Sequence, residues 1–215
     1  TPAERVHLIV YAGDGNDTVM IGASNLQYEV YLDDGNDSLA VDLAATNVSG
    51  IAYGGPGNDR LQGSLGDDEF HGGDGNDVLE GRGGNDILLG EEGHDTVLIH
   101  GTDADERLSM SFGRALLHGP AYSVEAGSAE EITVDGKRGY DIVERLEDSA
   151  GDDWVVMRLG ETVISGADFV NTAIGFEEVY AYGSAGNDTA SLYDTAAAYT
   201  FKSNGDADWA WMRGD

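Results

Sequence analysis

Five consecutive nine-residue units between Gly54 and Leu98 constrain this chain more than any other feature of its sequence. They read GGPGNDRLQ, GSLGDDEFH, GGDGNDVLE, GRGGNDILL and GEEGHDTVL. Each has glycine at the fourth place, aspartate at the sixth and a large apolar residue at the eighth. Two similar units, AGDGNDTVM and LDDGNDSLA, stand alone at residues 12–20 and 32–40. Seven such matches in the first 98 residues cannot arise from composition alone.

The residue types of one unit predict a cation-binding turn followed by a short strand. Glycine allows left-handed and crowded backbone conformations, so GGxGxD forms a tight turn whose carbonyls can point inward. A carboxylate and several carbonyls are hard oxygen ligands, which suit Ca²⁺ better than zinc or copper. The next three residues form a strand with one apolar side chain in a core. One turn cannot complete a shell of ~6–8 oxygens. Stacked turns can, because their sixth-place aspartates then lie side by side.

The tandem units resemble the calcium-binding nonapeptide GGxGxDxUx of the RTX (repeats-in-toxin, haemolysin-type) family. The resemblance covers the 45 tandem residues closely and reaches upstream if the isolated units are included. It implies a parallel β-roll in which successive nonapeptides alternate between two edges, so that two make one coil. It also implies that each ion lies between turns one coil apart. Its ligands would be the second- and fourth-place carbonyls of one turn, the first- and third-place carbonyls of the next, and both sixth-place aspartates.

The implied ligands fall into two columns. Asp17, Asp37 and Asp59 are 20 and 22 residues apart, one slightly enlarged coil each, and the next two members follow at 18. One edge should therefore carry Asp17, Asp37, Asp59, Asp77 and Asp95, and the other edge Asp68 and Asp86. Neighbouring members give about five Ca²⁺ ions as cofactors. The glycines expected to offer carbonyls are Gly13, Gly15, Gly35, Gly54, Gly55, Gly57, Gly63, Gly66, Gly72, Gly73, Gly75, Gly81, Gly84, Gly90 and Gly93.

Upstream of the tandem units, residues 1–53 predict further coils with a calcium turn on one edge only. Alternating and β-branched residues predict strands at residues 6–11, 18–21, 27–32, 38–43 and 48–53. The calcium β-roll should therefore span residues 1–100.

The second half of the chain contains a longer repeat. Leu116–Asp141 aligns without gaps on Val163–Asp188. We expect residues 101–215 to continue the β-helix, with ~46-residue copies at 95–141 and 142–188 and a truncated copy at 189–215. At about 23 residues per half, each copy is most simply two coils. The chain opens without Met and stops in mid-pattern, which predicts a piece of a longer protein.

The calcium motif decays along these copies. Asp141, Asp153 and Asp188 keep the sixth place, but we expect weaker ligands there. Equivalent loops lie about 46 residues apart, which would leave these aspartates without a carboxylate one coil away. The first copy has Ala104 and Glu106 at the fourth and sixth places, and the third has Ala197 and Tyr199. Such turns are not expected to bind the ion as the family does.

The charge of the chain limits its partners. It has 41 acidic and 11 basic residues, a net charge of −30. This balance repels nucleic acid and anionic membranes, and it disfavours a compact state unless cations compensate. The sequence contains no run of 18 apolar residues, so it does not predict membrane insertion. Calcium is the expected partner, while glycan binding and end-to-end self-association through open coil edges stay open.

These observations predict an all-β fold, an elongated right-handed parallel β-helix or β-roll solenoid. Its expected function is structural: a calcium-dependent, rigid acidic rod or spacer of a larger secreted or cell-surface bacterial protein. We do not expect an enzyme, because GxSxG, HExxH and phosphate-loop motifs are missing.

Two alternatives remain at this point. The first is a polysaccharide lyase or epimerase module on the same scaffold, which turnover of alginate or pectin would reveal. The second is an adhesin that binds a glycan or ice through a flat face. Retention on a glycan array without turnover would identify the adhesin.

Overall fold

The computed structural model describes residues 5–158, 160–193, 199–204 and 207–214, and the side chains among them except those of 192 and 199–214. The described residues form strands and turns without a helix, as expected for an all-β solenoid. Accordingly, no helix in the described part of the chain is long and apolar enough to cross a membrane. The chain divides into an N-terminal unit, residues 1–99 and 122–129, and a C-terminal unit, residues 100–121 and 130–215.

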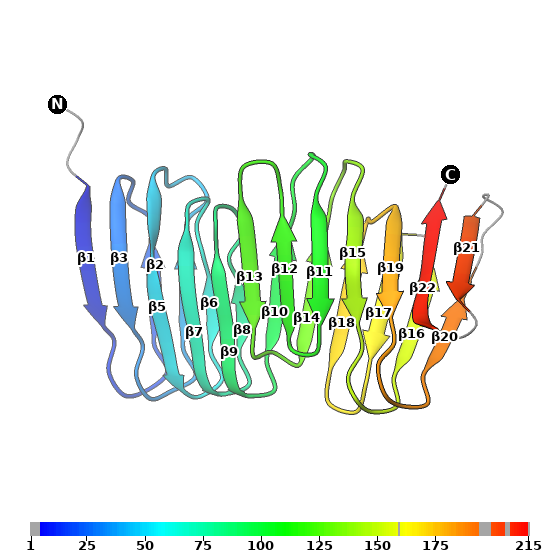
Figure 1. Cartoon of the computed structure of the whole chain (residues 1–215). Coiled ribbons are helices and arrows are strands. Elements are labelled where there is room, and N and C mark those ends of the chain that lie inside the picture. The colour runs from blue at the N-terminus through cyan, green and yellow to red at the C-terminus, as the bar shows by residue number, and fades with distance from the viewer. Residues whose placement is uncertain (1–4, 159, 194–198, 205–206, 215) are drawn as a thin grey trace. The chain divides into compact units, whose positions relative to one another are not determined.

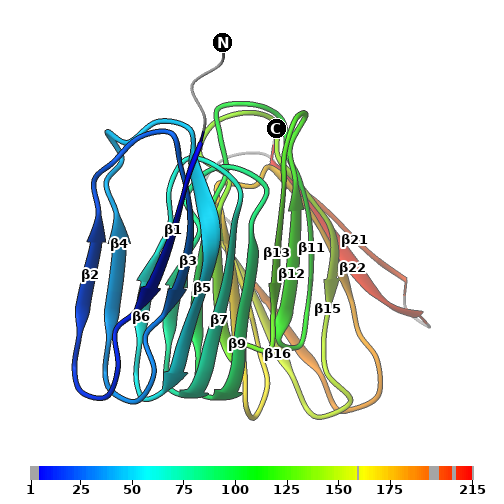
Figure 2. The same cartoon turned by 90° about the vertical axis from the view of Figure 1, so that its left-hand side faces the viewer.

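The N-terminal unit consists of two parallel sheets, and consecutive strands alternate between them (Figures 1 and 2). The first sheet has the order β1 (Val6–Tyr11), β3 (Leu26–Tyr31), β5 (Val48–Pro56), β7 (Asp68–Gly75), β9 (Ile87–Gly93) and β13 (Ser123–Gly127). The second has the order β2 (Thr18–Ile21), β4 (Ser38–Val41), β6 (Arg60–Gln62), β8 (Val78–Glu80) and β10 (Thr96–His100). Each coil therefore contributes one strand to each sheet. This is the parallel β-roll that the nonapeptides predicted.

The strands predicted upstream of the tandem units are confirmed with small shifts in their bounds. Residues 6–11 and 18–21 are strands as predicted. The third strand begins one residue early, at Leu26, and the fourth ends two residues early, at Val41. The fifth begins at Val48 and continues to Pro56.

The core between the sheets consists of columns of apolar side chains in register. On the first sheet Val30, Ala52, Phe70 and Leu88 lie one above another, each 0% exposed. On the second sheet Leu39, Leu61, Leu79 and Val97 do the same, also at 0%. The eighth-place residues of the tandem units are all in these two columns, so their predicted inward orientation is confirmed. Each coil after the first adds one buried layer to each column, whereas the strand of the first coil, β1, is mostly exposed.

The outer face of the first sheet also carries a column. The rings of Tyr11, Tyr31, Tyr53 and His71 stack face to face, with centroids 5.0, 5.1 and 4.9 Å apart. Parallel strands in register place equivalent side chains directly above one another, so one ring per coil is sufficient to build the stack.

The C-terminal unit differs, because antiparallel pairs interrupt its parallel ladders. One sheet has the order β12 (Arg114–His118), β11 (Arg107–Ser111), β15 (Ile142–Glu147), β19 (Glu178–Tyr182), β22 (Ala207–Gly214) and β21 (Tyr199–Asn204). The other has the order β14 (Glu131–Asp135), β18 (Val170–Ile174), β17 (Glu161–Ser165), β16 (Trp154–Arg158) and β20 (Thr189–Leu192). β11 pairs with β12, and β17 with both β16 and β18, in antiparallel fashion.

The prediction that each ~46-residue copy makes two parallel coils is wrong. The chain doubles back in a hairpin, β11–β12 in the first copy and β16–β17 in the second. The hairpin turns contain Gly113 and Gly160, whose φ angles of 63° and 70° favour glycine. One coil consequently takes 35 residues between Glu106 and Asp141. The copies still correspond, since β12 and β14 recur 47 residues later as β17 and β19. The third copy includes residues 194–198, which lie outside the described residues.

Removing one layer of the core should cost stability at a predictable level. We expect Leu61→Ala to lower the free energy of unfolding, at saturating Ca²⁺, by about 2–5 kcal/mol, because Leu61 is 0% exposed. Leu43→Ala is the matched control, since Leu43 is 52% exposed, and it should change stability by no more than about 0.5 kcal/mol. Urea unfolding followed by circular dichroism measures both. An equal loss of unfolding free energy in both variants would show that the eighth-place side chains do not stabilise the core.

Candidate metal centre

The structure brings the first predicted set of aspartates together in a column. Their turns lead into β2, β4, β6, β8 and β10. The backbone N–H of each of the first four aspartates donates to Oδ1 of the aspartate one coil later. The donor–acceptor distances are 2.7 Å from Asp17 to Asp37, 2.8 Å from Asp37 to Asp59, 2.7 Å from Asp59 to Asp77 and 2.8 Å from Asp77 to Asp95. One oxygen of each receiving carboxylate is therefore engaged by the protein itself.

Four carboxylates of the column have a second oxygen without such a partner. Oδ2 of Asp17, Asp37, Asp59 and Asp77 is buried and accepts no hydrogen bond. The side chains of Asp37, Asp59 and Asp77 are only 3%, 2% and 1% exposed. A buried, unsatisfied carboxylate oxygen is unfavourable by more than the ~1–3 kcal/mol of a neutral polar group. These oxygens therefore require a cation or a proton.

Backbone carbonyls converge on the same oxygens. A Cβ atom placed on Gly54 would lie 2.3 Å from Asp59 Oδ2 and 2.3 Å from the carbonyl oxygen of Gly72, in the next turn of the column. On Gly72 it would lie 2.3 Å from Asp77 Oδ2 and 2.6 Å from the Gly90 carbonyl. First-place glycine thus leaves open a space bordered by a carboxylate and a carbonyl from two turns. This donor set fits Ca²⁺, which takes oxygen ligands from carboxylates and carbonyls.

The other predicted glycines lie in the turns of the first column or in those of the second edge. The fourth-place carbonyl of each turn points at the fourth-place glycine of the next, and a Cβ on Gly75 would come within 1.8 Å of the Gly57 oxygen. A side chain is excluded there, and Gly75 also has a φ of 133°. By place, the predicted glycines are Gly54, Gly63, Gly72, Gly81 and Gly90 at the first, Gly13, Gly55 and Gly73 at the second, and Gly15, Gly35, Gly57, Gly66, Gly75, Gly84 and Gly93 at the fourth.

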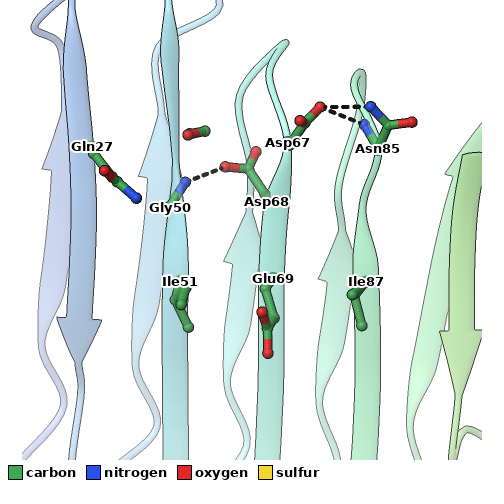
Figure 3. Close-up of a pocket in the computed structure, with 9 residues that line it drawn as sticks. Gln27, Gly50, Ile51, Asp67, Asp68, Glu69, Asn85 and Ile87 are labelled. Atoms are coloured by element: carbon green, nitrogen blue, oxygen red, sulfur yellow. Dashed lines mark hydrogen bonds between the residues drawn. The ribbon is translucent and has the colours of Figure 1, made fainter. Parts of the chain in front are cut away.

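On the second edge Asp68 lies beside Asp86, but the two carboxylates differ in their hydrogen bonds. Asp68 N donates to Asp86 Oδ1 at 3.0 Å, and Asp86 Oδ2 is buried without a partner. Both oxygens of Asp68 are hydrogen-bonded. Oδ1 accepts from Tyr28 Oη at 2.7 Å. It also accepts from Gly50 N at 3.0 Å (Figure 3). Oδ2 accepts from Ser64 N at 2.7 Å and from Ser64 Oγ at 2.9 Å.

Serine at the second place is the sequence difference behind this arrangement, since Gly55 and Gly73 stand there in the flanking units. Sequence reasoning placed Asp68 with the other ligands and gave no role to Ser64. The carbonyl of Gly63, next to Ser64, also has a donor in Arg82 Nη1 at 3.0 Å. This turn therefore has its polar groups satisfied by side chains where the turns of the first column do not.

A ladder of asparagines at the fifth place was also missed. Asn16 Oδ1 accepts from Asn36 N at 2.9 Å, and Asn36 Oδ1 from Asn58 N at 2.8 Å. Asn58 and Asn76 repeat the bond to the next turn, at 2.8 and 3.1 Å. On the second edge Asp67 Oδ1 accepts the corresponding hydrogen bond from Asn85 N, and a second one from Asn85 Nδ2 (Figure 3). The signal was present in the recurrent Asn-Asp dipeptide, whose first residue links turns without a metal.

Burial shifts the acidity of the aspartates in the turns. Removal from water, together with the charges of Asp59 and Asp95, raises the pKa of Asp77 to about 7. Burial likewise raises the pKa of Asp59 to about 6, and that of Asp86 to about 8. In the absence of a metal these carboxyls hold protons near neutral pH, so protons and cations compete for the same oxygens.

A comparison with protein families matches residues 9–25, 53–88 and 63–97 to the RTX calcium-binding nonapeptide repeat, in a form with four copies. The chain carries RTX calcium-binding repeats. Because RTX repeats bind Ca²⁺, the β-roll of the N-terminal unit is a calcium-binding module. A comparison with curated proteins gives no match.

In the C-terminal unit, beyond the RTX match, the expectation that the three remaining aspartates lack a carboxylate one coil away is wrong. Asp153 N donates to Asp188 Oδ1 at 3.1 Å, and Glu106 N donates to Asp141 Oδ1 at 2.8 Å. The hairpins lengthen each coil, so the carboxylate one coil away is 35 residues distant and not 46. Oδ2 of Asp153 accepts from Ser149 N and Oγ, both at 2.9 Å, which repeats the arrangement of Ser64 and Asp68.

Acid should partly replace calcium in folding this chain. Burial raises the folded-state pKa values of these carboxyls to about 6–8, above the unfolded value of ~3.9. Their contribution to the stability of the folded state is therefore fully present below pH ~3.9, and it is lost as the pH rises through 6–8. In calcium-free buffer we therefore expect β circular dichroism to increase from pH 8 to pH 5. Calcium affinity should change in the opposite sense, falling as pH drops below about 7. A calcium-free spectrum that does not change with pH would contradict the assigned acidity.

Proposed function

We propose that this chain is a calcium-dependent structural module, an acidic spacer, of a larger secreted or cell-surface bacterial protein. The observation that carries the proposal is that the two carboxylate oxygens of the first-column aspartates repeatedly have different surroundings. Oδ1 of Asp37, Asp59 and Asp77 accepts a hydrogen bond from the preceding turn, while Oδ2 of the same three residues is buried without a partner. Ca²⁺ supplies the missing charge between each pair of turns.

About five ions are proposed, four between neighbours in the first column and one between Asp68 and Asp86. Asp68 is already hydrogen-bonded through both oxygens, so its site should be the weakest of the five. Five divalent ions would change the net charge from −30 to about −20 (−30 plus five times two). The module would remain acidic enough to resist association.

Metal binding and folding should be one event in the N-terminal unit. The tandem units bury one large apolar side chain each, whereas ordering the backbone opposes folding by about 1–2 kcal/mol per residue. Unneutralised aspartates in the same column also repel each other. Calcium removes this repulsion and satisfies the buried oxygens, so the free energy of binding becomes free energy of folding.

A non-enzymatic role is part of the proposal. The pocket in Figure 3 is an open recess of about 260 Å³ over β3, β5, β7 and β9. Its lining is Gln27, Ser49, Gly50, Ile51, Asp67, Asp68, Glu69, Asn85 and Ile87. An acidic polysaccharide would need basic groups at such a place, and this lining contains acidic, amide and apolar groups. The recess therefore supports a structural face over a lyase or epimerase cleft.

Loss of one shared aspartate should affect two sites at once. We expect Asp77→Asn to bind about two ions fewer and to raise the calcium concentration at the midpoint of folding by about tenfold or more, because Asp77 borders two inter-turn spaces. Asp42→Asn is the matched control. Asp42 is exposed outside the nonapeptides and uses Oδ1 for a bond from Ala44 N, which asparagine retains. Circular dichroism during a calcium titration gives the midpoints, and coincident curves would refute the proposed function.

The affinity should suit an extracellular setting. Each proposed ion has two carboxylates and otherwise carbonyls, a low formal charge, so we expect dissociation constants of ~10⁻⁴–10⁻³ M. Such sites stay empty in the cytosol and fill outside the cell, which would let the chain cross a secretion channel unfolded. Isothermal titration of the calcium-free chain measures this. Submicromolar affinity at every site would remove the argument for export before folding.

A further inference from the structure

Two turns of the C-terminal unit repeat the calcium arrangement outside the RTX match. The turn of residues 101–106 lies one coil before the turn of residues 136–141, and the bond from Glu106 N to Asp141 Oδ1 measures 2.8 Å. Asp59 and Asp77 are joined by the same bond at 2.7 Å. The first of these turns departs from the nonapeptide, with alanine at the fourth place and glutamate at the sixth.

The two carboxylate oxygens of Glu106 have different surroundings, as in the aspartates of the first column. Its side chain is 1% exposed. Oε1 accepts from Thr102 N at 3.0 Å and also from Thr102 Oγ1. Oε2 is buried and has no hydrogen-bond partner. Thr102 fixes the orientation of the group, so Oε2 faces the space between the turns.

Carbonyls from both turns border that space. A Cβ atom on Gly101 would lie 2.8 Å from Glu106 Oε2 and 3.0 Å from the Gly136 oxygen, somewhat wider than the 2.3 Å found twice at Gly54. On Gly139 it would lie 2.4 Å from the Ala104 oxygen and 2.9 Å from Asp141 Oδ1. A carboxylate oxygen and a carbonyl therefore meet at each of these two glycines, between the same two turns, and the longer glutamate reaches the position that aspartate has elsewhere.

The surrounding charges favour a cation there. Asp141 is 0% exposed, and its N–H donates to Glu177 Oε2 at 2.7 Å, which adds a third carboxylate nearby. Lys137 in the second turn is paired with Asp135, with Nζ 2.7 Å from Oδ2. Arg138 is exposed. Since Lys137 is already neutralised, the buried carboxylates keep an uncompensated negative charge.

The arrangement ends after this one pair of turns. In the first column the Gly72 carbonyl approaches Gly54, and the Gly90 carbonyl approaches Gly72. At Gly136 the nearest atom from a following turn is instead Cε2 of Phe176, 3.4 Å from a Cβ position. An aromatic carbon offers no ligand, so the column provides one site.

We propose that the turns of residues 101–106 and 136–141 bind one further Ca²⁺ through Glu106, Asp141 and the carbonyls of Ala104 and Gly136. This site uses the ligand chemistry of the proposed function but lies in the other unit and outside the nonapeptide pattern. It makes glutamate an acceptable sixth-place residue where threonine at the second place orients it. The C-terminal unit would then also depend on calcium.

The test counts ions. The 215-residue wild-type chain and its Glu106→Gln and Glu144→Gln variants are compared by equilibrium dialysis against saturating Ca²⁺ at pH 7.5, with circular dichroism to confirm folding. Glutamine keeps an oxygen for Thr102 and removes the charge. Glu144, exposed on β15 in the same unit, is the matched control. We expect Glu106→Gln to bind one ion fewer than wild type, and Glu144→Gln to bind the wild-type number.

An unchanged count in Glu106→Gln would overturn this site and leave the RTX sites untouched, whereas a wild-type chain without bound calcium would overturn both. Tb³⁺ provides a readout that does not rely on Glu106→Gln folding. Tyr140 precedes Asp141 directly, while the fifth places of the first column are Asn16, Asn36, Asn58, Asn76 and His94. Tyr140→Phe should therefore lose part of the tyrosine-sensitised Tb³⁺ emission. Emission equal to that of wild type would contradict an ion at this turn.

Discussion

The N-terminal unit depends on one interaction, the hydrogen bond from the backbone of one sixth-place aspartate to the carboxylate of the next. It sets the spacing of the coils at the calcium edge, because every turn must approach its neighbour to within 2.7–2.8 Å at this point. The same bond leaves the second carboxylate oxygen turned toward carbonyls, where only a cation or a proton satisfies it. Glycine at the first and fourth places follows from that spacing, since a side chain would occupy positions that neighbouring oxygens already approach.

Three turns stabilise their carboxylate by another means. Ser64, Thr102 and Ser149 stand at the second place and donate from backbone and hydroxyl to the sixth-place carboxylate of their own turn. For Asp68, whose other oxygen accepts from Tyr28 and Gly50, these bonds satisfy both oxygens, so its turn requires calcium less than the turns of the first column. For Glu106 these bonds engage one oxygen, while the other is buried and faces the inter-turn space. A hydroxyl at one position therefore sets how strongly a turn requires calcium.

The sequence predicted most of the N-terminal unit because its rules are local and periodic. Fixed spacing placed Asp17 to Asp95 in a column, and the eighth place identified Phe70 and Leu61 as core residues, since each coil repeats the one before it. The hairpins of the C-terminal unit could not be read in this way. Their strands have the same alternating pattern whether they continue a coil or turn back on themselves, and only Gly113 and Gly160 mark the reversal. Partners 35 residues apart were hidden for the same reason, because the spacing rule assumed coils without insertions.

The alternation of strands between two sheets limits how the length of this protein can change. The strand and the sixth-place backbone of a nonapeptide pair with those of the unit 18 residues away, on its own edge. Gain or loss of two nonapeptides therefore preserves every ladder, every column of side chains and every inter-turn space. Gain or loss of one would move all following strands to the opposite sheet and bring Asn85 and its neighbours beneath turns built for the other edge. Genetic variation in the repeat should accordingly proceed in whole coils, with the pair of nonapeptides as the unit of duplication.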